Sequence, residues 1–276
     1  MIHVTRRSET FRFRDIACRP VPSLLRGFSA PVNLTLDIAD RDLEFLMAND
    51  ADLFNRWQAA NTYATRTIIH IVKALKEGRR STRGLAYAKA LGITIADTRL
   101  EPAYRAELLK LPTQADIARE MGQGVDPGLI HRAHRQLSRL IAKTLIDELK
   151  KIYRQMTTQA PFAADAYSAG CRALRNAVLT LLVARSERSD IALASRHFEH
   201  ATNMTDEAHA LFLLAATSGS ARDKAVSRFF ERWNHDHLVI DTWFAAQAVS
   251  PAPDTITRVR ELVSHPLFCI TTPNKV

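Results

Sequence analysis

The chain has 276 residues, 46% of them hydrophobic, and no apolar stretch approaches the roughly 18 to 20 residues of a membrane-spanning helix, so we expect no membrane partner. Its 38 Lys and Arg exceed its 29 Asp and Glu by nine, which raises nucleic acid as a partner. No RNA-binding aromatic signature or Cys/His finger accompanies the charge, and we therefore do not expect nucleic acid to be bound.

Residues 9–38 alternate between apolar and polar side chains, as strands with one buried face do. Phe11 and Phe13 alternate with arginines, and Val32, Leu34 and Leu36 alternate with polar residues. Prolines interrupt the pattern, which predicts short strands with irregular edges. Because two or three strands do not form a stable sheet structure alone, these strands are expected to need others.

From residue 40 onward the sequence predicts helices joined by short connections. Asp50 is expected to cap a long helix that ends at Gly78. Thr113 begins a pattern similar to a capping box, and Asp126-Pro127 favours a further helix start. Consecutive helices of about 10 to 25 residues without a repeating sequence signature predict a mainly α fold, an irregular α-helical superhelix.

Many of the basic residues fall on the helix that begins after Asp126. These are His131, Arg132, Arg135, Arg139, Lys143, Lys150, Lys151 and Arg154. Apolar residues at helical spacing from Leu129 to Ile152 give the same helix a buried face. We therefore predict that the basic residues form its solvent face.

Six residues of metal-ligand type fall within thirteen positions: His197, Glu199, His200, Asp206, Glu207 and His209. The two nearer histidines end one predicted helix, whereas His209 lies in the next, so no fixed three-ligand face results. Histidines near a helix C-terminus and acidic residues at the next helix start are also what helix dipoles favour. We expect no metal site here.

Other possible site residues have structural interpretations. His131 and His134 are expected to be a surface pair, and His235–His237 a polar turn. Gly122–Gly124 is expected to be a linker, because it lacks the third glycine of a dinucleotide loop and the lysine of a P-loop. Helical spacing predicts core positions for the aromatic residues Phe229, Phe230, Trp233, Trp243 and Phe244.

The three cysteines, Cys18, Cys171 and Cys269, are odd in number and widely scattered. This pattern predicts neither a disulfide framework nor a zinc cluster. Cys171 falls on an apolar stripe without a nearby histidine, so a buried, inert thiol is expected. Together with the lack of an apolar signal segment, the cysteines favour a cytoplasmic location. The sequence identifies no catalytic, metal-binding or substrate-binding residue.

Several ordered blocks of sequence are similar to one known family. Residues 19–34 (RPVPSLLRGFSAPVNL), Leu174–Ala177, Asn203–Asp206, residues 238–251 (LVIDTWFAAQAVSP) and residues 266–275 (PLFCITTPNK) are the main ones. In order and spacing they resemble the C-terminal part of bacterial aminopeptidase N, a family of zinc metallopeptidases that remove residues from peptide N-termini. The block at residues 19–34 resembles the segment that closes the family's small β-sandwich domain.

The resemblance implies two parts. Residues 1–38 would be the C-terminal strands of an incomplete Ig-like β-sandwich domain, and residues 39–276 a helical domain that is incomplete at its C-terminus. In the family, the helical domain closes a substrate chamber over a catalytic domain that holds one zinc through two histidines and a glutamate. The His-Glu-x-x-His helix of that domain is absent from these 276 residues.

The resemblance therefore implies a fragment that is inactive by itself and holds no cofactor. Its implied partners are the missing N-terminal and catalytic domains of the same polypeptide, with peptides bound by the full enzyme. The alternative is an independent α-helical scaffold that binds protein or nucleic acid. That alternative explains the charge and the lack of a site, but neither the order of the blocks nor the strands.

Overall fold

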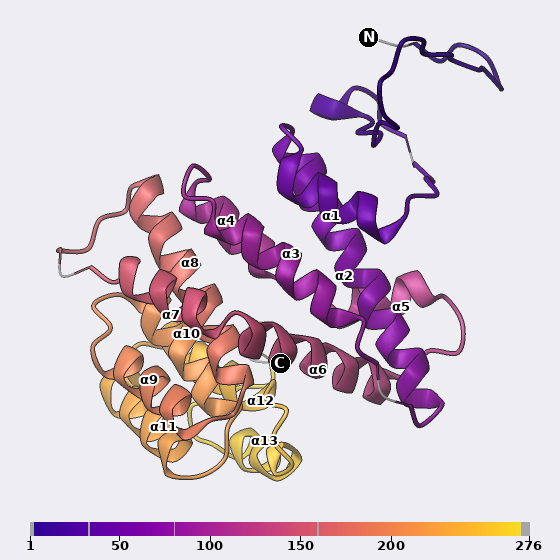
Figure 1. Ribbon diagram of the computed structural model, residues 1–276. Coiled ribbons are helices and arrows are strands. Elements are labelled where there is room, and N and C mark those ends of the chain that lie inside the picture. The colour runs from indigo at the N-terminus through magenta and orange to yellow at the C-terminus, as the bar shows by residue number, and fades with distance from the viewer. Residues whose placement is uncertain (1–2, 33, 80, 159, 272–276) are drawn as a thin grey trace.

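The computed structural model describes residues 3–32, 34–79, 81–158 and 160–271. These residues form one short 3-10 helix, η1 (Arg26–Phe28), and thirteen α-helices (Figure 1). The α-helices are α1 (Asp40–Asn49), α2 (Leu53–Lys76), α3 (Gly84–Ala96), α4 (Pro102–Leu109), α5 (Gln114–Met121), α6 (Pro127–Thr144), α7 (Ile146–Gln155), α8 (Ala166–Ala184), α9 (Arg188–Glu199), α10 (Met204–Ala215), α11 (Ser220–Trp233), α12 (Val239–Ala248) and α13 (Thr255–Val263). The predicted mainly α fold is confirmed.

The N-terminal segment differs from the strands that its alternation predicts. Its described residues contain no strand, and Phe11, Phe13, Val32 and Leu34 are 43%, 66%, 59% and 50% exposed. A strand needs a neighbour to receive its backbone hydrogen bonds, and no described segment pairs with this one. In Figure 1 the segment extends away from the helices. Its sequence pattern is that of a strand, but the pairing partner is lacking.

Side-chain hydrogen bonds attach the end of this segment to the first helices. The Arg19 guanidinium donates to Asp42 at 2.8 Å, and the Ser23 hydroxyl donates to Asp50 at 2.6 Å. Asp50 therefore does not cap the long helix, as its position predicts. That role belongs to Asp52, whose carboxylate accepts from the Asn55 amide at 3.0 Å. The prediction was two residues early because Asp50 has a partner in the preceding segment.

Two of the predicted helix starts are confirmed by their caps. The Thr113 hydroxyl accepts from the Asp116 amide at 3.1 Å at the start of α5. The Asp126 carboxylate accepts from the Leu129 amide at 3.0 Å, and Pro127 is the first residue of α6. These caps satisfy backbone donors that have no partner within the helix.

The basic helix is two helices, α6 and α7, which divide at Leu145. Arg132, Arg135 and Lys143 are exposed on α6, as predicted. Arg139 is an exception, because it is half-buried and its Nε donates to the Ala184 carbonyl at 3.1 Å. Most of this charge is therefore a solvated face, and one arginine joins α6 to the end of α8.

Buried side chains form two hydrophobic clusters, one centred on α1–α8 and one on α9–α13. Helix α8 contributes to both, with Leu174 and Val178 in the first cluster and Leu179 in the second. Trp243, 8% exposed, belongs to the second cluster, and its Nε1 donates to the Val226 carbonyl at 2.9 Å. Phe229 and Phe244 are buried as predicted, whereas Phe230 and Trp233 are half-buried.

Helices α4 and α8 approach each other closely at Gly170. A β-carbon at this position would lie 2.9 Å from the backbone nitrogen of Ala103. Such a distance is too short for any side chain, so only glycine permits this contact. The close contact fixes the start of α8, which carries part of the site described below.

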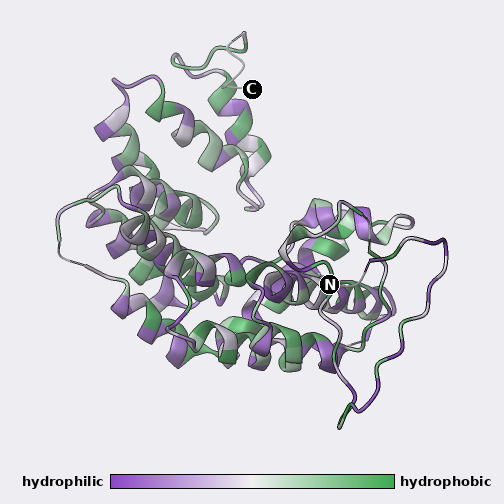
Figure 2. Ribbon diagram, turned by 90° about the horizontal axis from the view of Figure 1, so that it is seen from above, coloured by the Kyte–Doolittle hydropathy of each residue, from purple (hydrophilic) through white to green (hydrophobic). Residues whose placement is uncertain are grey.

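The helices follow one another along a curved path, with α1 and α2 near one end and α12 and α13 near the other (Figures 1 and 2). Most of them carry both hydrophobic and hydrophilic residues (Figure 2). Across the part of the chain that the structure describes, no helix is long and apolar enough to cross a membrane.

Candidate functional site

Asp206, in the first turn of α10, is the centre of a buried polar cluster. The Asn203 side chain caps this helix by accepting from the Asp206 amide at 3.0 Å. The cap anchors the first turn of the helix, and the Asp206 carboxylate contacts residues of α8 and α9. Its side chain is only 1% exposed.

Several polar side chains surround this carboxylate. The Arg175 guanidinium of α8 forms an ion pair with Oδ2, which also accepts from Asn203 Nδ2 at 2.9 Å. Asn176 Nδ2 donates to Oδ1 at 3.0 Å. His197 Nε2 of α9 lies 3.6 Å from the same oxygen, beyond hydrogen-bond distance. Asp206 thus joins three helices through one carboxylate.

These contacts govern the protonation of Asp206. Burial alone would raise the pKa of this carboxyl, but His197, Asn203 and the Arg175 charge outweigh burial and hold it well below its usual range. The group is therefore an anion at neutral pH. A carboxylate this tightly paired is a poor general base, because its partners stabilise the charged form.

Two further residues complete the cluster. The Tyr153 hydroxyl of α7 lies 2.8 Å from His197 Nδ1. His209 Nε2 of α10 lies 2.9 Å from the Asn176 carbonyl, and burial lowers the pKa of this imidazole. The hydrogen bond to a carbonyl requires a protonated Nε2, so His209 is a neutral donor in the folded protein.

A cavity of about 860 Å³ opens beside the Asp206 cluster. Its walls come from the ends of α7 and α9, the starts of α8 and α10, and the segment that precedes α8. Arg175, His197 and Asp206 belong both to the cluster and to the cavity wall. Cys171 also lines this cavity and is half-buried, so the expectation of a fully buried thiol was wrong.

The structure divides the six clustered candidates of metal-ligand type. His197 and Asp206 meet in the cluster, whereas Glu199 and His200 are exposed. Glu207 is buried and accepts from Trp233 Nε1 at 3.2 Å. Among the described residues, no group of three His, Cys, Asp or Glu is arranged to hold a metal ion.

The other candidates have structural partners. His131 Nδ1 lies 3.2 Å from Gln114 Nε2, and burial lowers the pKa of His134. Asp236 of the His235–His237 turn accepts from the Leu238 amide at 3.0 Å and so begins α12. Gly122 and Gly124 have φ values of +68° and +66° between α5 and α6, which is a turn and no phosphate loop.

Arg175, Asn176 and Tyr153 were not among the residues expected to form a site. They lie 31, 30 and 53 positions before Asp206, the first two on α8 and Tyr153 on α7. No local spacing connects residues at such separations. Only the packing of α8 against α10, and of α7 against α8, brings them into one cluster, in which Tyr153 contacts His197.

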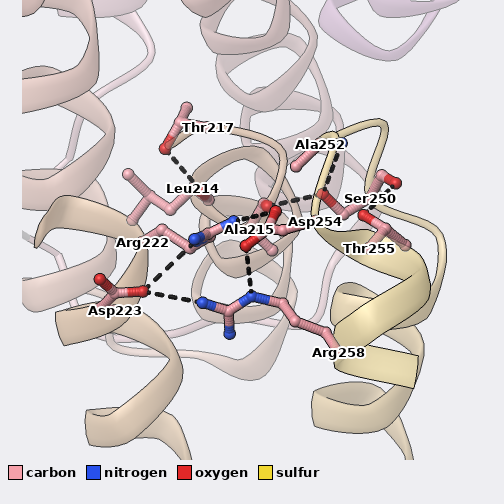
Figure 3. A network of polar contacts seen from close by, with 10 residues as sticks. All are labelled: Leu214, Ala215, Thr217, Arg222, Asp223, Ser250, Ala252, Asp254, Thr255 and Arg258. Atoms are coloured by element: carbon pink, nitrogen blue, oxygen red, sulfur yellow. Dashed lines mark hydrogen bonds and ion pairs between the residues drawn. The ribbon is translucent and has the colours of Figure 1, made fainter. Parts of the chain in front are cut away.

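A second polar cluster lies on the surface between α11 and α13 (Figure 3). Arg222 Nη1 donates to Asp254 at 2.8 Å, and Arg258 bridges Asp254 and Asp223 at 3.1 Å each. The Ser250 hydroxyl donates to the Ala215 carbonyl at 2.8 Å, which ties the end of α12 to the end of α10. These contacts fix the C-terminal helices relative to one another.

Two family models match the chain. The model described as a domain of unknown function with ARM repeats (DUF3458_C) matches residues 40–276. The model described as a domain of unknown function with an Ig-like fold (DUF3458) matches residues 1–37. The ARM-repeat description agrees with the predicted superhelix, and the Ig-like description with the strand pattern that precedes it.

Two aminopeptidases N and one solved structure are similar to nearly the whole chain. Aminopeptidase N of Caulobacter vibrioides is 40% identical over 97% of this chain, which spans 30% of that protein. Aminopeptidase N of Escherichia coli is 33% identical over the whole chain, which spans 32% of it. The crystal structure of Legionella pneumophila aminopeptidase A in complex with aspartic acid is 28% identical, with a TM-score of 0.80 over 96% of this chain and 32% of that one. The chain thus spans about a third of these relatives.

Proposed function

Because this chain belongs to the aminopeptidase N family and corresponds to its C-terminal helical region, we propose that it closes the substrate chamber of such an enzyme. The catalytic domain, with its zinc, would come from the rest of the enzyme. In this proposal the chain shapes the space that peptides enter and carries out no chemical step by itself.

The observation that carries the proposal is the extent of the similarity. Between 97% and 100% of this chain aligns with two aminopeptidases N, in each case over only about a third of the relative. The His-Glu-x-x-His sequence that would bind zinc is absent from the 276 residues. The described side chains offer no alternative ligand set, so we assign them no step that needs the metal.

A chimaeric enzyme tests the proposal. This chain would replace the matching region of the Caulobacter vibrioides enzyme, which is 40% identical to it over 267 residues. We expect the chimaera to hydrolyse aminoacyl arylamides and to retain one zinc per molecule. The isolated chain is expected to do neither.

Two controls make the result decisive. The Caulobacter enzyme without the exchanged region should lose activity if the helical region is needed to form the chamber. A folded, zinc-loaded chimaera without activity would contradict the proposal. Turnover with one tightly held zinc by the isolated chain would contradict it as well, since the metal site would then lie within these residues.

The same proposal assigns a cytoplasmic location and no nucleic-acid partner. The odd number and wide scatter of the cysteines, Cys18, Cys171 and Cys269, fit a reducing compartment. The basic residues of α6 fit weak electrostatic contact alone, so affinity for DNA should be about micromolar or weaker and fall steeply with salt. Sequence-selective nanomolar binding at physiological salt would favour the scaffold alternative.

A further inference from the structure

The cavity beside Asp206 carries an excess of positive charge. Three arginines line it, Arg172, Arg175 and Arg196, and Asp206 is the one carboxylate among its described lining residues. Arg175 and Asn203 already engage that carboxylate. Two guanidinium groups therefore remain for an anion that enters the cavity.

The arginines differ in how firmly they are held. Arg172 Nη1 donates to the Ala163 carbonyl at 2.8 Å, and its guanidinium lies 4.7 Å above the centre of the Phe162 ring. Arg196, at the end of α9, is exposed and forms no ion pair with any described carboxylate. The Arg172 guanidinium is thus held in one orientation, whereas the Arg196 side chain can reorient to contact a ligand.

Arg175, Arg196 and the Tyr153 hydroxyl belong to the same cavity wall. Burial raises the pKa of the Tyr153 hydroxyl, and the charges of Arg175 and Arg196 both oppose that rise. Both arginines and Tyr153 line this one cavity. A carboxylate that enters the cavity would meet the guanidinium groups of Arg172 and Arg196, the planar donors that pair most strongly with carboxylates.

Part of the remaining wall is apolar and aromatic. Phe162, Tyr167, Met156 and Leu193 line the cavity together with the arginines. A volume of about 860 Å³ is within the range of small-molecule sites, which combine apolar walls with a few polar groups that orient the ligand. The lining therefore fits a small molecule that carries both a carboxylate and an apolar group.

We propose that this cavity binds the α-carboxylate of an amino acid or short peptide whose C-terminal side chain is apolar. Arg172 and Arg196 would bind the carboxylate, and Phe162 and Tyr167 would contact the side chain. The choice of peptides rests on the proposed function, whereas the requirement for an anion and an apolar group rests on the cavity alone.

Calorimetry with the whole chain tests this site directly. The probes are glycyl-phenylalanine, its C-terminal amide, free phenylalanine and inorganic phosphate. We expect the dipeptide to bind and the amide to bind at least about tenfold more weakly, since the amide lacks the charge that the arginines recognise. Comparison with free phenylalanine distinguishes a peptide ligand from an amino acid.

Variants locate the binding. Arg172→Gln and Arg196→Gln should each weaken dipeptide binding about tenfold or more. The matched control is Arg188→Gln, also on α9, because Arg188 is exposed and lines a second cavity between α9 and α11 but not this one. Arg196 lines both cavities, so the comparison of Arg172→Gln with Arg188→Gln decides which cavity holds the ligand. The control should bind as the parent does. Circular dichroism of each variant checks that the fold is retained.

Several results would overturn the site. These are equal affinity for the acid and the amide, equal affinity for phosphate and the dipeptide, or no binding at all. A loss in Arg188→Gln with none in Arg172→Gln would move the ligand to the second cavity. Because binding is measured on this chain alone, an inactive chimaera would count against the proposed function and leave this result unaffected.

Discussion

Asp206 and Asp254 are two aspartates that each join helices through arginine, in opposite surroundings. Asp206 is buried at the start of α10, with its side chain 1% exposed, and contacts α8 and α9. Asp254 lies on the surface between α11 and α13, 44% exposed, and contacts Arg222 and Arg258 (Figure 3). Both carboxyls have lowered pKa values, yet we expect very different contributions to stability.

The difference comes from water. When Asp254 loses its partners, solvent replaces them at little cost, and salt screens the pair in any case. When Asp206 is removed, Arg175 stays half-buried without its anion, and Asn176 loses its acceptor in the core. A buried charge without a partner is far more costly than a broken surface pair. The two ion pairs have similar geometry, but the stability of the fold depends far more on the buried pair of Asp206 than on the surface pair of Asp254.

The largest effect is expected for Asp206→Ala. Breaking a buried ion pair costs about 3 to 5 kcal/mol, a large part of the stability of many domains. Chemical denaturation of this variant beside the parent and Asp254→Ala measures the difference. If Asp206→Ala had the parent's denaturation midpoint, the cluster would be dispensable and the comparison wrong.

Acid should destabilise the fold in two stages, first through His209 and then through Asp206. The folded pKa of Asp206 is lower than the unfolded value of about 3.9, so its contribution is present above pH of about 4 and is lost as pH falls toward the folded pKa. His209 also has a lowered folded pKa, so stability declines earlier, as pH falls below about 6.5 and the unfolded state gains protons.

Denaturation midpoints measured between neutral pH and about pH 3 would test whether stability falls with pH in this way. We expect a gradual decline below about pH 6.5 and a steeper one below about pH 4. Asp206→Asn should remove most of the steeper decline and keep the gradual one. A variant with the same profile as the parent would show that other carboxyls determine acid unfolding.

The smallest effect is expected for Asp254→Asn. Arg222 and Arg258 lower the pKa of Asp254 to about 2, but the carboxyl is open to solvent. We expect the thermal midpoint to fall by no more than about 2 °C. The difference should disappear at about 1 M salt, where the Debye length is about 3 Å. A large, salt-independent loss would mean that this network holds the C-terminal helices as firmly as the buried cluster holds α10.

The sequence predicts the helices well, but it predicts the Asp206 cluster only in part. Thr113 and Asp126 cap the helices that their spacing predicts. His197 and Asp206 were recognised as neighbours in sequence, but as part of a group that the fold separates. Asp50 was misplaced as a cap because its partner, Ser23, lies 27 residues away. Each error involves a contact between residues far apart in the chain.

The sequence by itself determined the helical architecture and the lack of a zinc-binding helix, because periodicity, caps and motifs depend on residues a few positions apart. Tertiary structure alone decided that Arg175, His197 and Asp206 share one centre beside a cavity, since those residues belong to three helices. It also decided that the strand pattern near Phe11 and Phe13 forms no strand here. Local side-chain order can specify a strand, but its hydrogen bonds must come from a neighbour.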